Sequence, residues 1–347
     1  MTPLEQLPIP LLQWYGEHAR TLPWRSDPTP YHVWVSEIML QQTRVAAVLD
    51  YYRRFLDAVP GVAELAELDT EQLMKLWQGL GYYSRARNLQ KAARQIVEKF
   101  DGVFPSRYED IRSLAGIGDY TAGAIASIAF GQPVPAVDGN VLRVVSRLCA
   151  DHADITLSAT KKQVAEALAQ VIPVARPGDF NQAMMELGAT VCLPNGEPLC
   201  EQCPARDFCL AHRDGLTGQL PVKAPKKARR VEERTVYLIF HERRIALRQR
   251  SDKGLLAGLW EYPNELTGAG ERPEDWPICG HVERVGTGRH IFSHIEWHMS
   301  AVAMQAESDD LPAGWVWADR QELERRYAVP NAFDPFRAAV LDRLGHF

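Results

Sequence analysis

Two carboxylates in the first half of the chain occupy settings that could give them opposite protonation states. Glu37 stands among apolar and aromatic residues, and burial in a cleft would raise its pKa and make it a usable general acid near neutral pH. Asp138 precedes the helical stretch Val141–Ala150, where a capping carboxylate is held in its ionised form. A neutral acid and a nearby carboxylate are what cleavage of a glycosidic bond requires. The alternative is that Glu37 is a solvated residue on a helix face and that Asp138 only caps a helix, in which case neither would take part in catalysis.

A glycine-containing turn, Gly116-Ile117-Gly118, separates two helical patterns and lies upstream of Asp138. Glycine lets the backbone turn tightly and lets a phosphate approach N–H groups that a side chain would shield. The positive N-terminal end of the following helix adds to the attraction. Such a device would hold a nucleic-acid backbone without reading its sequence, and an ordinary turn is the alternative.

Four cysteines form the strongest local pattern in the chain. Their spacing is C-x7-C-x2-C-x5-C, at Cys192, Cys200, Cys203 and Cys209. Structural zinc usually takes two ligand pairs separated by a longer stretch, whereas four thiols this close can surround one compact centre. The spacing therefore favours a [4Fe–4S] cluster held by all four cysteines over a zinc ion.

A second glycine-rich turn, Gly79–Tyr83, ends in two tyrosines and is followed by Arg85 and Arg87. Tyr82 at its tip could insert between the base steps of a duplex while the neighbouring cations neutralise phosphates. A helix with a solvated basic face gives the same pattern. The residues alone favour neither interpretation.

The elements that must position these groups are mainly helices. An amphipathic helix is expected at about Pro10–Arg20. Thr29 reads as the N-cap of a second helix with Pro30 at its first position. The apolar pattern predicts that this helix continues unbroken to just before Pro60. Further helices are expected on both sides of the glycine hairpin and from about Asp179.

The composition changes between Gly218 and Arg230, where apolar periodicity stops and cations cluster, as in a linker between domains. Beyond it the pattern becomes β. Strands are expected at Thr235–Phe240, Ile245–Arg250, His290–His298 and His298–Gln305, with a closing helix near Pro335–Leu344. We therefore expect a mainly α N-terminal half at 1–216, a basic linker at 217–232 and an α+β domain at 233–347.

Composition and charge set further bounds. The chain has 347 residues, 46% hydrophobic and 24% charged, as in a globular protein of two domains. No apolar run approaches the ~18 residues of a membrane helix, and the first residues show no signal-peptide pattern. We therefore expect a cytoplasmic protein whose six cysteines serve metal binding or chemistry rather than disulfides.

Charge argues for a local nucleic-acid contact rather than a global field. Lys and Arg against Asp and Glu number 20 and 25 in residues 1–217, but 19 and 19 in residues 218–347. The acidic excess thus lies in the half that carries the hairpin. Any binding of nucleic acid by this half depends on local basic patches.

Taken in order, these motifs resemble those of the MutY-type adenine DNA glycosylases, which are helix-hairpin-helix, iron–sulfur enzymes of base-excision repair. The resemblance covers nearly the whole chain: Leu22–Arg25, Ser36–Thr43, Gly79–Tyr83, the hairpin, Val137–Asn140, Phe180–Gln182, the cysteines and a Nudix-like C-terminal half. It implies a two-lobed helical domain with a [4Fe–4S] loop and a Nudix-like domain that recognises 8-oxoguanine. The implied activity is hydrolysis of the N-glycosidic bond of adenine mispaired with 8-oxoguanine or guanine in double-stranded DNA, by a nucleoid-associated monomer.

The same resemblance implies a role for each candidate residue. Glu37 would protonate the adenine and Asp138 would stabilise or attack the sugar cation, with Tyr120 and Asn140 beside them. The other implied contacts are with the flipped adenine (Leu22, Trp24, Gln182 and Arg20), with the DNA backbone and the gap beside that base (Gln42, Tyr82, Gly116, Gly118, Arg85 and Arg87), and with 8-oxoguanine (Phe292, Ser293 and His294). The first cysteine spacing is one residue longer than the family's C-x6-C, so Leu193–Leu199 is expected to bulge.

Three other functions fit part of the pattern. An endonuclease III-like enzyme would remove oxidised pyrimidines and cut the strand, but that type carries a lysine where this chain has Tyr120, and tyrosine cannot form the Schiff base. A non-catalytic mismatch-binding protein would not depend on Glu37 or Asp138. A nucleotide pyrophosphohydrolase would need a Glu-rich metal-binding helix, which the sequence after Gly258 lacks. We therefore expect a monofunctional glycosylase that leaves an abasic site.

Overall fold

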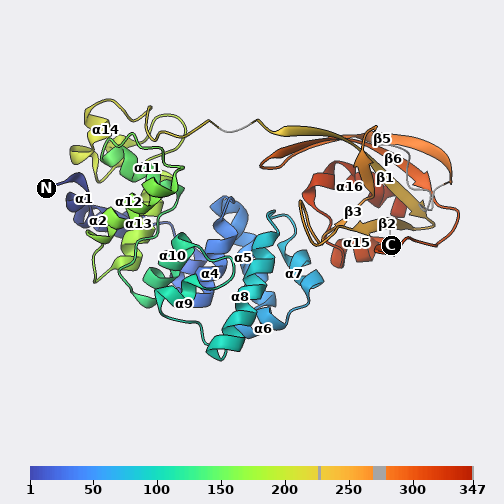
Figure 1. Ribbon diagram of the computed structural model, residues 1–347, viewed down its shortest axis with the longest axis horizontal. Helices are drawn as coiled ribbons and strands as arrows, with labels where there is room; N and C mark the ends of the chain where they lie inside the picture. Colours follow the sequence, from blue (N-terminus) through green and yellow to red (C-terminus); the bar gives the residue numbers. More distant parts are fainter. Residues whose placement is uncertain (226–227, 269–278, 346–347) are drawn as a thin grey trace. The chain divides into compact units, whose positions relative to one another are not determined.

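The chain divides into two compact units (Figure 1). The computed structural model describes residues 1–225, 228–268 and 279–345. One unit comprises Met1–Glu67 and Asn88–Pro225, and the other comprises Leu68–Arg87 and Lys226–Phe347. Lys226 and Lys227, which fall in the expected linker, lie outside the described residues. Among the residues that are described, no helix is both long and apolar enough to span a bilayer.

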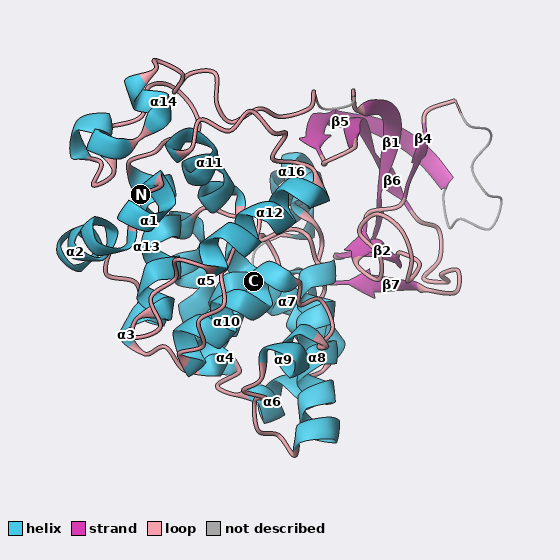
Figure 2. Ribbon diagram, turned by 60° about the vertical axis from the view of Figure 1, so that its left-hand side comes forward, coloured by secondary structure: helices cyan, strands magenta, loops and turns pink. Residues whose placement is uncertain are grey.

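The first unit is built from helices, and the strands of the described residues all belong to the second (Figure 2). Its helices are α1 (Pro3–Gln6), α2 (Pro8–His18), α3 (Pro23–Ser26), α4 (Pro30–Leu40), α5 (Val45–Ala58), α6 (Val62–Glu67), most of α8 (Ser84–Phe100), α9 (Tyr108–Arg112), α10 (Asp119–Phe130), α11 (Gly139–Leu148), α12 (Ser158–Ala169), α13 (Pro177–Thr190) and α14 (Leu210–Arg213), with short 3-10 turns η1 (Cys200–Gln202) and η2 (Arg206–Phe208).

The expectation of one helix from Pro30 to just before Pro60 is wrong. The N-cap is as expected, because the Thr29 side chain accepts the His32 N–H at 3.2 Å. The helix nevertheless ends at Leu40 and α5 begins at Val45. Gln42 in the break has a φ of 61°, a left-handed conformation that no helix continues through. The Gln41–Arg44 connection therefore leaves the helix, and Gln41 Nε2 donates to Thr121 Oγ1 of α10 at 3.4 Å.

Apolar faces of α2, α11 and α13 form one hydrophobic cluster of the first unit. Leu11, Val145, Phe180 and Met184 are among the side chains that are fully or almost fully buried there. α10 packs against both α4 and α13, and its close approach to the segment before α11 requires glycine. A Cβ at Gly123 would lie 2.3 Å from the Pro135 carbonyl oxygen. This packing brings α4, α10, α13 and the start of α11 around one place.

The second unit is a mixed sheet with helices. Its strands are β1 (Arg230–His241), β2 (Arg244–Gln249), β3 (Trp260–Glu261), β4 (Asn264–Leu266), β5 (Cys279–Ile291), β6 (Ile295–Gln305) and β7 (Trp315–Ala318), and its helices are α7 (Thr70–Trp77), α15 (Arg320–Arg325), the 3-10 turn η3 (Asn331–Phe333) and α16 (Asp334–Leu344). The strand order is β3-β2-β1-β6-β5, with β4 beside β1 and β7 beside β2. β1 and β6 run parallel, and the other pairs are antiparallel.

Alternate residues of the central strands build the core of this unit. Val236 and Leu238 of β1 and Trp297 of β6 are buried with Phe336 and Val340 of α16, as the two-residue period of a strand requires. The β1–β2 hairpin and the closing helix agree with the expectation from sequence. These elements give the α+β half its own core.

The expected strand His290–His298 is wrong at both ends, because β5 runs from Cys279 to Ile291. The sequence predicted strands at His290–His298 and His298–Gln305, but β5 ends at Ile291 and β6 begins at Ile295. Phe292–His294 forms the turn between them, closed by a 2.8 Å bond from the Phe292 N–H to the Ile295 carbonyl. The turn contains no glycine, proline or asparagine, so the usual sequence signal of a hairpin is absent.

α7 and the turn that follows it pack against the C-terminal part of the second unit. Lys75 Nζ donates to the carbonyls of Leu323 and Tyr327 at 3.1 and 3.2 Å, and Gln78 Nε2 donates to Val329 O at 2.6 Å. Burial lowers the pKa of Lys75 to about 8. The Gly79–Tyr83 turn is thereby held within this unit.

Candidate functional site

A cavity of about 370 Å³ in the first unit collects the candidate catalytic residues. Its wall comes from the Arg20–Arg25 turn, α4, the α4–α5 connection and the starts of α10 and α11, with α13 behind them. Its lining includes Glu37, Tyr120, Asp138, Asn140, Arg20, Leu22, Trp24, Gln182 and Gln42. The volume lies within the range of ligand-binding pockets.

Glu37 is buried in this cavity wall, with 6% of its surface exposed. Tyr120 Oη donates a short hydrogen bond to its Oε2. Burial raises the pKa of Glu37 to about 7; the bond from Tyr120 and the charge of Arg25 oppose the rise, and the charge of Asp138 adds to it. Burial also raises the pKa of Tyr120 well above its ordinary value, so Tyr120 keeps its proton. Glu37 can therefore hold or release a proton near neutral pH.

Asp138 is the N-cap of α11, as expected. Its Oδ1 accepts the Val141 N–H at 2.8 Å, and its Oδ2 accepts from Asn140 Nδ2 at 2.7 Å. Burial raises the pKa of Asp138, while these hydrogen bonds oppose the rise. Both bonds are donated to the carboxyl group, so both favour its ionised form. The two carboxyl groups thus differ in their partners: Glu37 accepts from the Tyr120 hydroxyl, whereas Asp138 accepts from the Val141 backbone and from Asn140.

Asn140 is itself held from behind by Arg143. Arg143 Nη2 donates to Asn140 Oδ1 at 2.9 Å and to Gly188 O at 2.8 Å, and its Nε donates to Cys192 O at 2.8 Å. The approach of α13 to Asn140 needs a glycine, because a Cβ at Gly188 would lie 2.6 Å from the Asn140 Cβ. Asn140 can therefore present only its amide N–H to Asp138.

Two arginines and a glutamate form the polar side of the cavity. Glu186 is 1% exposed and accepts from Arg20 at 2.5 and 2.8 Å and from Arg25 at 2.7 Å. Burial alone would raise the pKa of Glu186, but the bonds from the arginines outweigh it and lower the pKa. Leu22 and Trp24, each almost fully buried, add apolar wall beside this group. A planar base with polar edges would find both kinds of contact here.

The glycine hairpin lies between α9 and α10. Gly116 has a φ of 74°, and a Cβ there would lie 2.6 Å from the Asn88 Cβ, so a side chain fits neither the conformation nor the space. Gly118 precedes α10, and nothing lies within 4 Å of where its Cβ would be. Tyr120 follows in the first turn of the same helix. One helix start therefore presents both the open backbone at Gly118 and the partner of Glu37.

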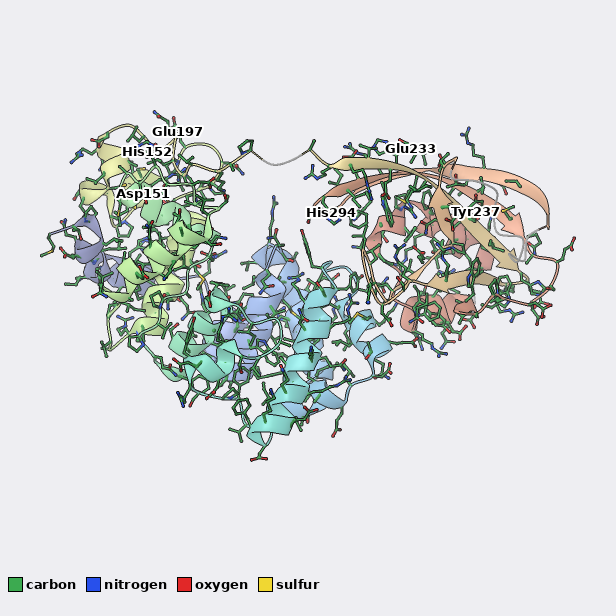
Figure 3. All side chains as sticks on the ribbon, viewed as in Figure 1. Asp151, His152, Glu197, Glu233, Tyr237 and His294 are labelled. Atoms are coloured by element: carbon green, nitrogen blue, oxygen red, sulfur yellow. The ribbon has the colours of Figure 1, made fainter. Side chains whose placement is uncertain are left out.

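Of the residues expected to probe the strand opposite the flipped base, Gln42 lies in the first unit, whereas Tyr82, Phe292, Ser293 and His294 lie in the second. Tyr82 is 49% exposed, has a φ of 47°, and its Oη lies 3.0 Å from Ser293 Oγ. Both residues, with Phe292 and His294, line a cavity of about 590 Å³. The Phe292 ring packs edge-on against Trp297, with ring centroids 4.9 Å apart. Ser293 and His294 are exposed at the tip of the β5–β6 turn, where Figure 3 labels His294.

The two arginines after Tyr82 are placed differently from the expectation that they contact phosphate. Arg85 is 8% exposed, and its Nη2 donates to the carbonyls of Leu80 and Gly81 at 3.1 and 3.2 Å. Arg87 Nη1 donates to Ala257 O at 2.8 Å. The Arg85 guanidinium therefore holds the Gly79–Tyr83 turn, whereas that of Arg87 binds the backbone at Ala257.

The four cysteines line one small cavity. Cys192, Cys200, Cys203 and Cys209 surround about 30 Å³, and the structure records them as free thiols. Arg147 Nη1 donates to Cys192 Sγ at 3.3 Å. Within the described ranges, no three His, Cys, Asp or Glu side chains are grouped closely enough to hold a metal ion.

The longer first cysteine spacing is taken up by an outward loop. The Leu199 N–H donates to Val191 O at 2.9 Å, so the segment between them closes on itself. Residues 194–197 are exposed, and Gly196 has a φ of 74°. Glu197 is labelled on this loop in Figure 3. The additional residue therefore lies away from the cavity between the thiols.

Four residues of the site were not anticipated from the sequence: Arg25, Arg143, Met185 and Glu186. Arg143 had a signal, because it and Arg147 are charged residues in the otherwise apolar pattern of α11 and each is 4% exposed. Arg20 and Glu186 are separated by 166 positions in sequence, and only the packing of α13 beside the Arg20–Arg25 turn shows that they pair.

Two family models match the chain. The model described as HhH-GPD superfamily base excision DNA repair protein matches residues 35–173, and the NUDIX domain model matches residues 235–339. These matches confirm the expected fold class, a helical helix-hairpin-helix half followed by a Nudix-like α+β half.

Known proteins resemble the chain in sequence and in fold. The adenine DNA glycosylase of Mus musculus is 38% identical over an alignment of 380 positions, gaps included, that covers 90% of this chain and 74% of the mouse protein. The structure of a thermostable thymine-DNA glycosylase superposes with a TM-score of 0.56 at 26% identity and covers 61% of this chain and 97% of its own. A trapped endonuclease III–DNA covalent intermediate superposes with a TM-score of 0.52 at 24% identity, over 62% of this chain and 100% of its own, a likeness of fold.

Proposed function

The chain belongs to the family of adenine DNA glycosylases, and we propose that its substrate is adenine mispaired with 8-oxoguanine or guanine in double-stranded DNA. The activity of the family is hydrolysis of the bond between the base and the sugar. The observation that carries the proposal is the pairing of Glu37 and Asp138 at one cavity, in environments that differ in burial and in hydrogen-bond donors. We propose a monomer in the cytoplasm, acting on the nucleoid.

The adenine must leave the base stack to reach Glu37. Leu22 and Trp24 would contact its faces, and Arg20 and Gln182 would contact its polar edges, since all four line the cavity. Adenine is a poor leaving group until a ring nitrogen is protonated. Glu37 would donate that proton, and Tyr120 would keep its carboxyl group in place through their hydrogen bond.

Departure of the base leaves positive charge on the sugar. The C1′–N9 electron pair goes to the protonated adenine, and water finally supplies hydroxide to C1′ and a proton to the solvent. Asp138, with two hydrogen bonds that favour its ionised form, would stabilise the cation or form a transient bond to C1′. Asn140 would hold Asp138 and contact the sugar.

Strand cleavage is not expected from this site. A glycosylase that also cuts the strand uses an amine to form a Schiff base with the sugar. The position expected to carry that amine is Tyr120, whose hydroxyl is hydrogen-bonded to Glu37. We therefore propose a monofunctional enzyme whose product is an abasic site.

DNA outside the cavity would meet both units. The hairpin of Gly116 and Gly118, with its open backbone at Gly118, would receive a phosphate. Gln42, exposed in the α4–α5 connection, and Tyr82 would fill the gap beside the flipped base. The Phe292–His294 turn would read 8-oxoguanine, with the Ser293 hydroxyl as the group that can both donate and accept.

We propose that Cys192, Cys200, Cys203 and Cys209 hold a [4Fe–4S] cluster. The cavity between the four thiols and the cationic Arg147 beside Cys192 suit a centre that carries thiolate charge. When bound, the cluster would cross-link residues 192–209. The purified protein is expected to contain about four iron and four sulfide ions per chain. Zinc without sulfide would overturn this proposal.

A single-turnover assay tests the function. The protein is incubated with a duplex containing one adenine opposite 8-oxoguanine, and strand breaks are measured with and without alkali. We expect breaks at that adenine only after alkali, and no adduct trapped by borohydride. Breaks without alkali, with a stoichiometric trapped adduct, would show an endonuclease III-like lyase instead. Absence of breaks even after alkali would leave a mismatch-binding protein.

The same assay tests the role of the Phe292–His294 turn. Wild type is expected to act faster on adenine opposite 8-oxoguanine than on adenine opposite guanine. The double variant Ser293→Ala, His294→Ala is expected to reduce this ratio about tenfold, the effect of losing one or two hydrogen bonds. Ser308→Ala, which also changes an exposed serine, is the matched control. An unchanged ratio in the double variant would remove the assignment.

A further inference from the structure

The Tyr120 hydroxyl has two acceptors but only one proton to donate. Its Oη lies within hydrogen-bond distance of Glu37 Oε2 and 3.2 Å from Met185 Sδ. Glu37 comes from α4, Tyr120 from α10 and Met185 from α13, and all three line the cavity. The hydroxyl can therefore donate to the carboxylate or to the sulfur, and not to both at once.

The protonation state of Glu37 decides which acceptor is used. An ionised Glu37 is an acceptor only, and a charged acceptor binds a hydroxyl proton more strongly than a thioether does. When Glu37 is protonated on Oε2, it donates a hydrogen bond to Tyr120 Oη. The Tyr120 hydroxyl then no longer donates to Glu37, and it donates to Met185 Sδ instead. The bond to sulfur thus exists only when Glu37 carries its proton.

We propose that Met185 is a positioning residue for the general acid. Its sulfur accepts a hydrogen bond from the Tyr120 hydroxyl when Glu37 is protonated, and this bond stabilises the acid form of Glu37. The inference rests on the proposed function, because it assigns Glu37 the part of the proton donor. It concerns the free enzyme, before adenine enters.

The position of Met185 is well defined by its neighbours on α13. Met184 is 1% exposed on one side and Glu186 is 1% exposed on the other, so the backbone between them has little freedom. A methionine side chain is long enough to reach Tyr120 and offers a neutral, weak acceptor. A carboxylate at the same place would compete with Glu37 for the proton, which the sulfur does not.

Other charged groups face Glu37 and set the range in which this bond acts. Asp138, at the start of α11, raises the pKa of Glu37 after burial has raised it, and Arg25 of α3 lowers it. Glu186 of α13 and Arg20 line the same cavity and are paired with each other. None of these changes when Met185 is replaced by an apolar residue. Such a replacement therefore isolates the contribution of the sulfur.

The test is the pH dependence of the single-turnover rate. For wild type we expect a fall in rate as pH rises through about 7, where Glu37 loses its proton. Met185→Leu removes the acceptor with little change of volume and is expected to move this fall about half a pH unit lower. Met184→Leu, the same substitution in the adjacent buried position, is expected to leave it in place. Met185→Ile serves if the leucine variant folds poorly.

A double-mutant cycle makes the test specific. Tyr120→Phe removes the donor to ionised Glu37 and is expected to move the fall to higher pH, opposite to Met185→Leu. In the Tyr120→Phe background, Met185→Leu is expected to have no further effect, because phenylalanine has no hydroxyl group to donate to the sulfur of Met185. Equal shifts in both backgrounds, or no shift in either, would overturn the proposal.

A second readout does not depend on activity. The carbonyl stretch of a protonated carboxylic acid can be followed by infrared titration and assigned to Glu37 by its loss in Glu37→Gln. The same downward shift is expected for Met185→Leu. A protein that releases no adenine but shows this shift would refute the proposed function alone. Release of adenine with no shift in the titration would refute the role of Met185 alone.

Discussion

Glu37→Gln is expected to lower the single-turnover rate of adenine release by about 10³-fold, the size of a lost general acid. Glutamine fills the same volume and still accepts the hydrogen bond from Tyr120, but it has no proton to give. The residual rate is expected to be independent of pH through 7, because the group whose pKa is raised to about 7 is absent. Release is measured as alkali-sensitive breaks over time.

The melting temperature shows whether the lower rate of Glu37→Gln comes from the lost proton donor or from an unfolded protein. The pKa of Glu37 is about 7 in the folded protein against an ordinary value of 4.5. A carboxyl whose pKa is raised by folding contributes its stability below pH 4.5 and loses it as pH rises through 7. At pH 8 wild type has lost about 3 kcal/mol of unfolding free energy that the glutamine variant keeps. Glu37→Gln is therefore expected to melt several degrees higher than wild type at pH 8 and equally at pH 4.

Two results would contradict this assignment. A Gln variant that retained more than a tenth of the wild-type rate would show that the proton comes from elsewhere. A Gln variant less stable than wild type at pH 8 would show that Glu37 is a structural partner in its ionised form. Glu98→Gln, at an exposed position of α8, controls for the loss of one charge.

Asp138→Asn is expected to reduce the same rate by about 10³-fold, since it removes the negative charge opposite the developing sugar cation. Asparagine is as good an N-cap as aspartate, so its oxygen can still accept the Val141 N–H that now lies 2.8 Å from Oδ1. The new amide group then faces the Asn140 Nδ2 that donates to Oδ2 in wild type, so the melting temperature is expected to fall by a few degrees and the fold to be kept. The rate and the melting curve are measured on the same preparation.

Asp138→Ala provides the comparison that separates charge from capping. It is expected to lose the rate to a similar extent and, in addition, about 1 kcal/mol of stability from the lost cap. A rate for Asp138→Asn within tenfold of wild type would mean that capping is the main task of the residue. In that case the sugar cation would need another anion at the cavity.

Much of the fold could be predicted because its signals are local. Thr29 before Pro30 predicted the start of α4, Asp138 predicted the cap of α11, and the change from helical to alternating periodicity predicted the two halves. These features need only neighbours within four residues along the chain. The expected strands Thr235–Phe240 and Ile245–Arg250 overlap with β1 and β2, but the expected strand His290–His298 runs across the turn between β5 and β6.

The breaks without a signal show the limit of that reasoning. Nothing in Gln41–Arg44 stops a helix by propensity, and yet α4 ends there with Gln42 in a left-handed conformation. The free energy that favours ending α4 here must come from tertiary packing, which can outweigh a helix-propensity difference of less than 1 kcal/mol per residue. Arg85 is a similar case, since its position in sequence predicts a solvated cation, but the carbonyls of the Gly79–Tyr83 turn bind it instead.

By itself, the sequence determined which residue types are available and in what order: two carboxylates, a tyrosine where a related enzyme would need a lysine, and four closely spaced thiols. Only the tertiary structure decided what they can do. The pKa of Glu37 depends on burial and on charges from α3 and the start of α11, and the Arg20–Glu186 pair and the Tyr120–Met185 contact join helices far apart in the chain. Proton affinity follows from the dielectric and the partners around a group, and packing brings those partners together.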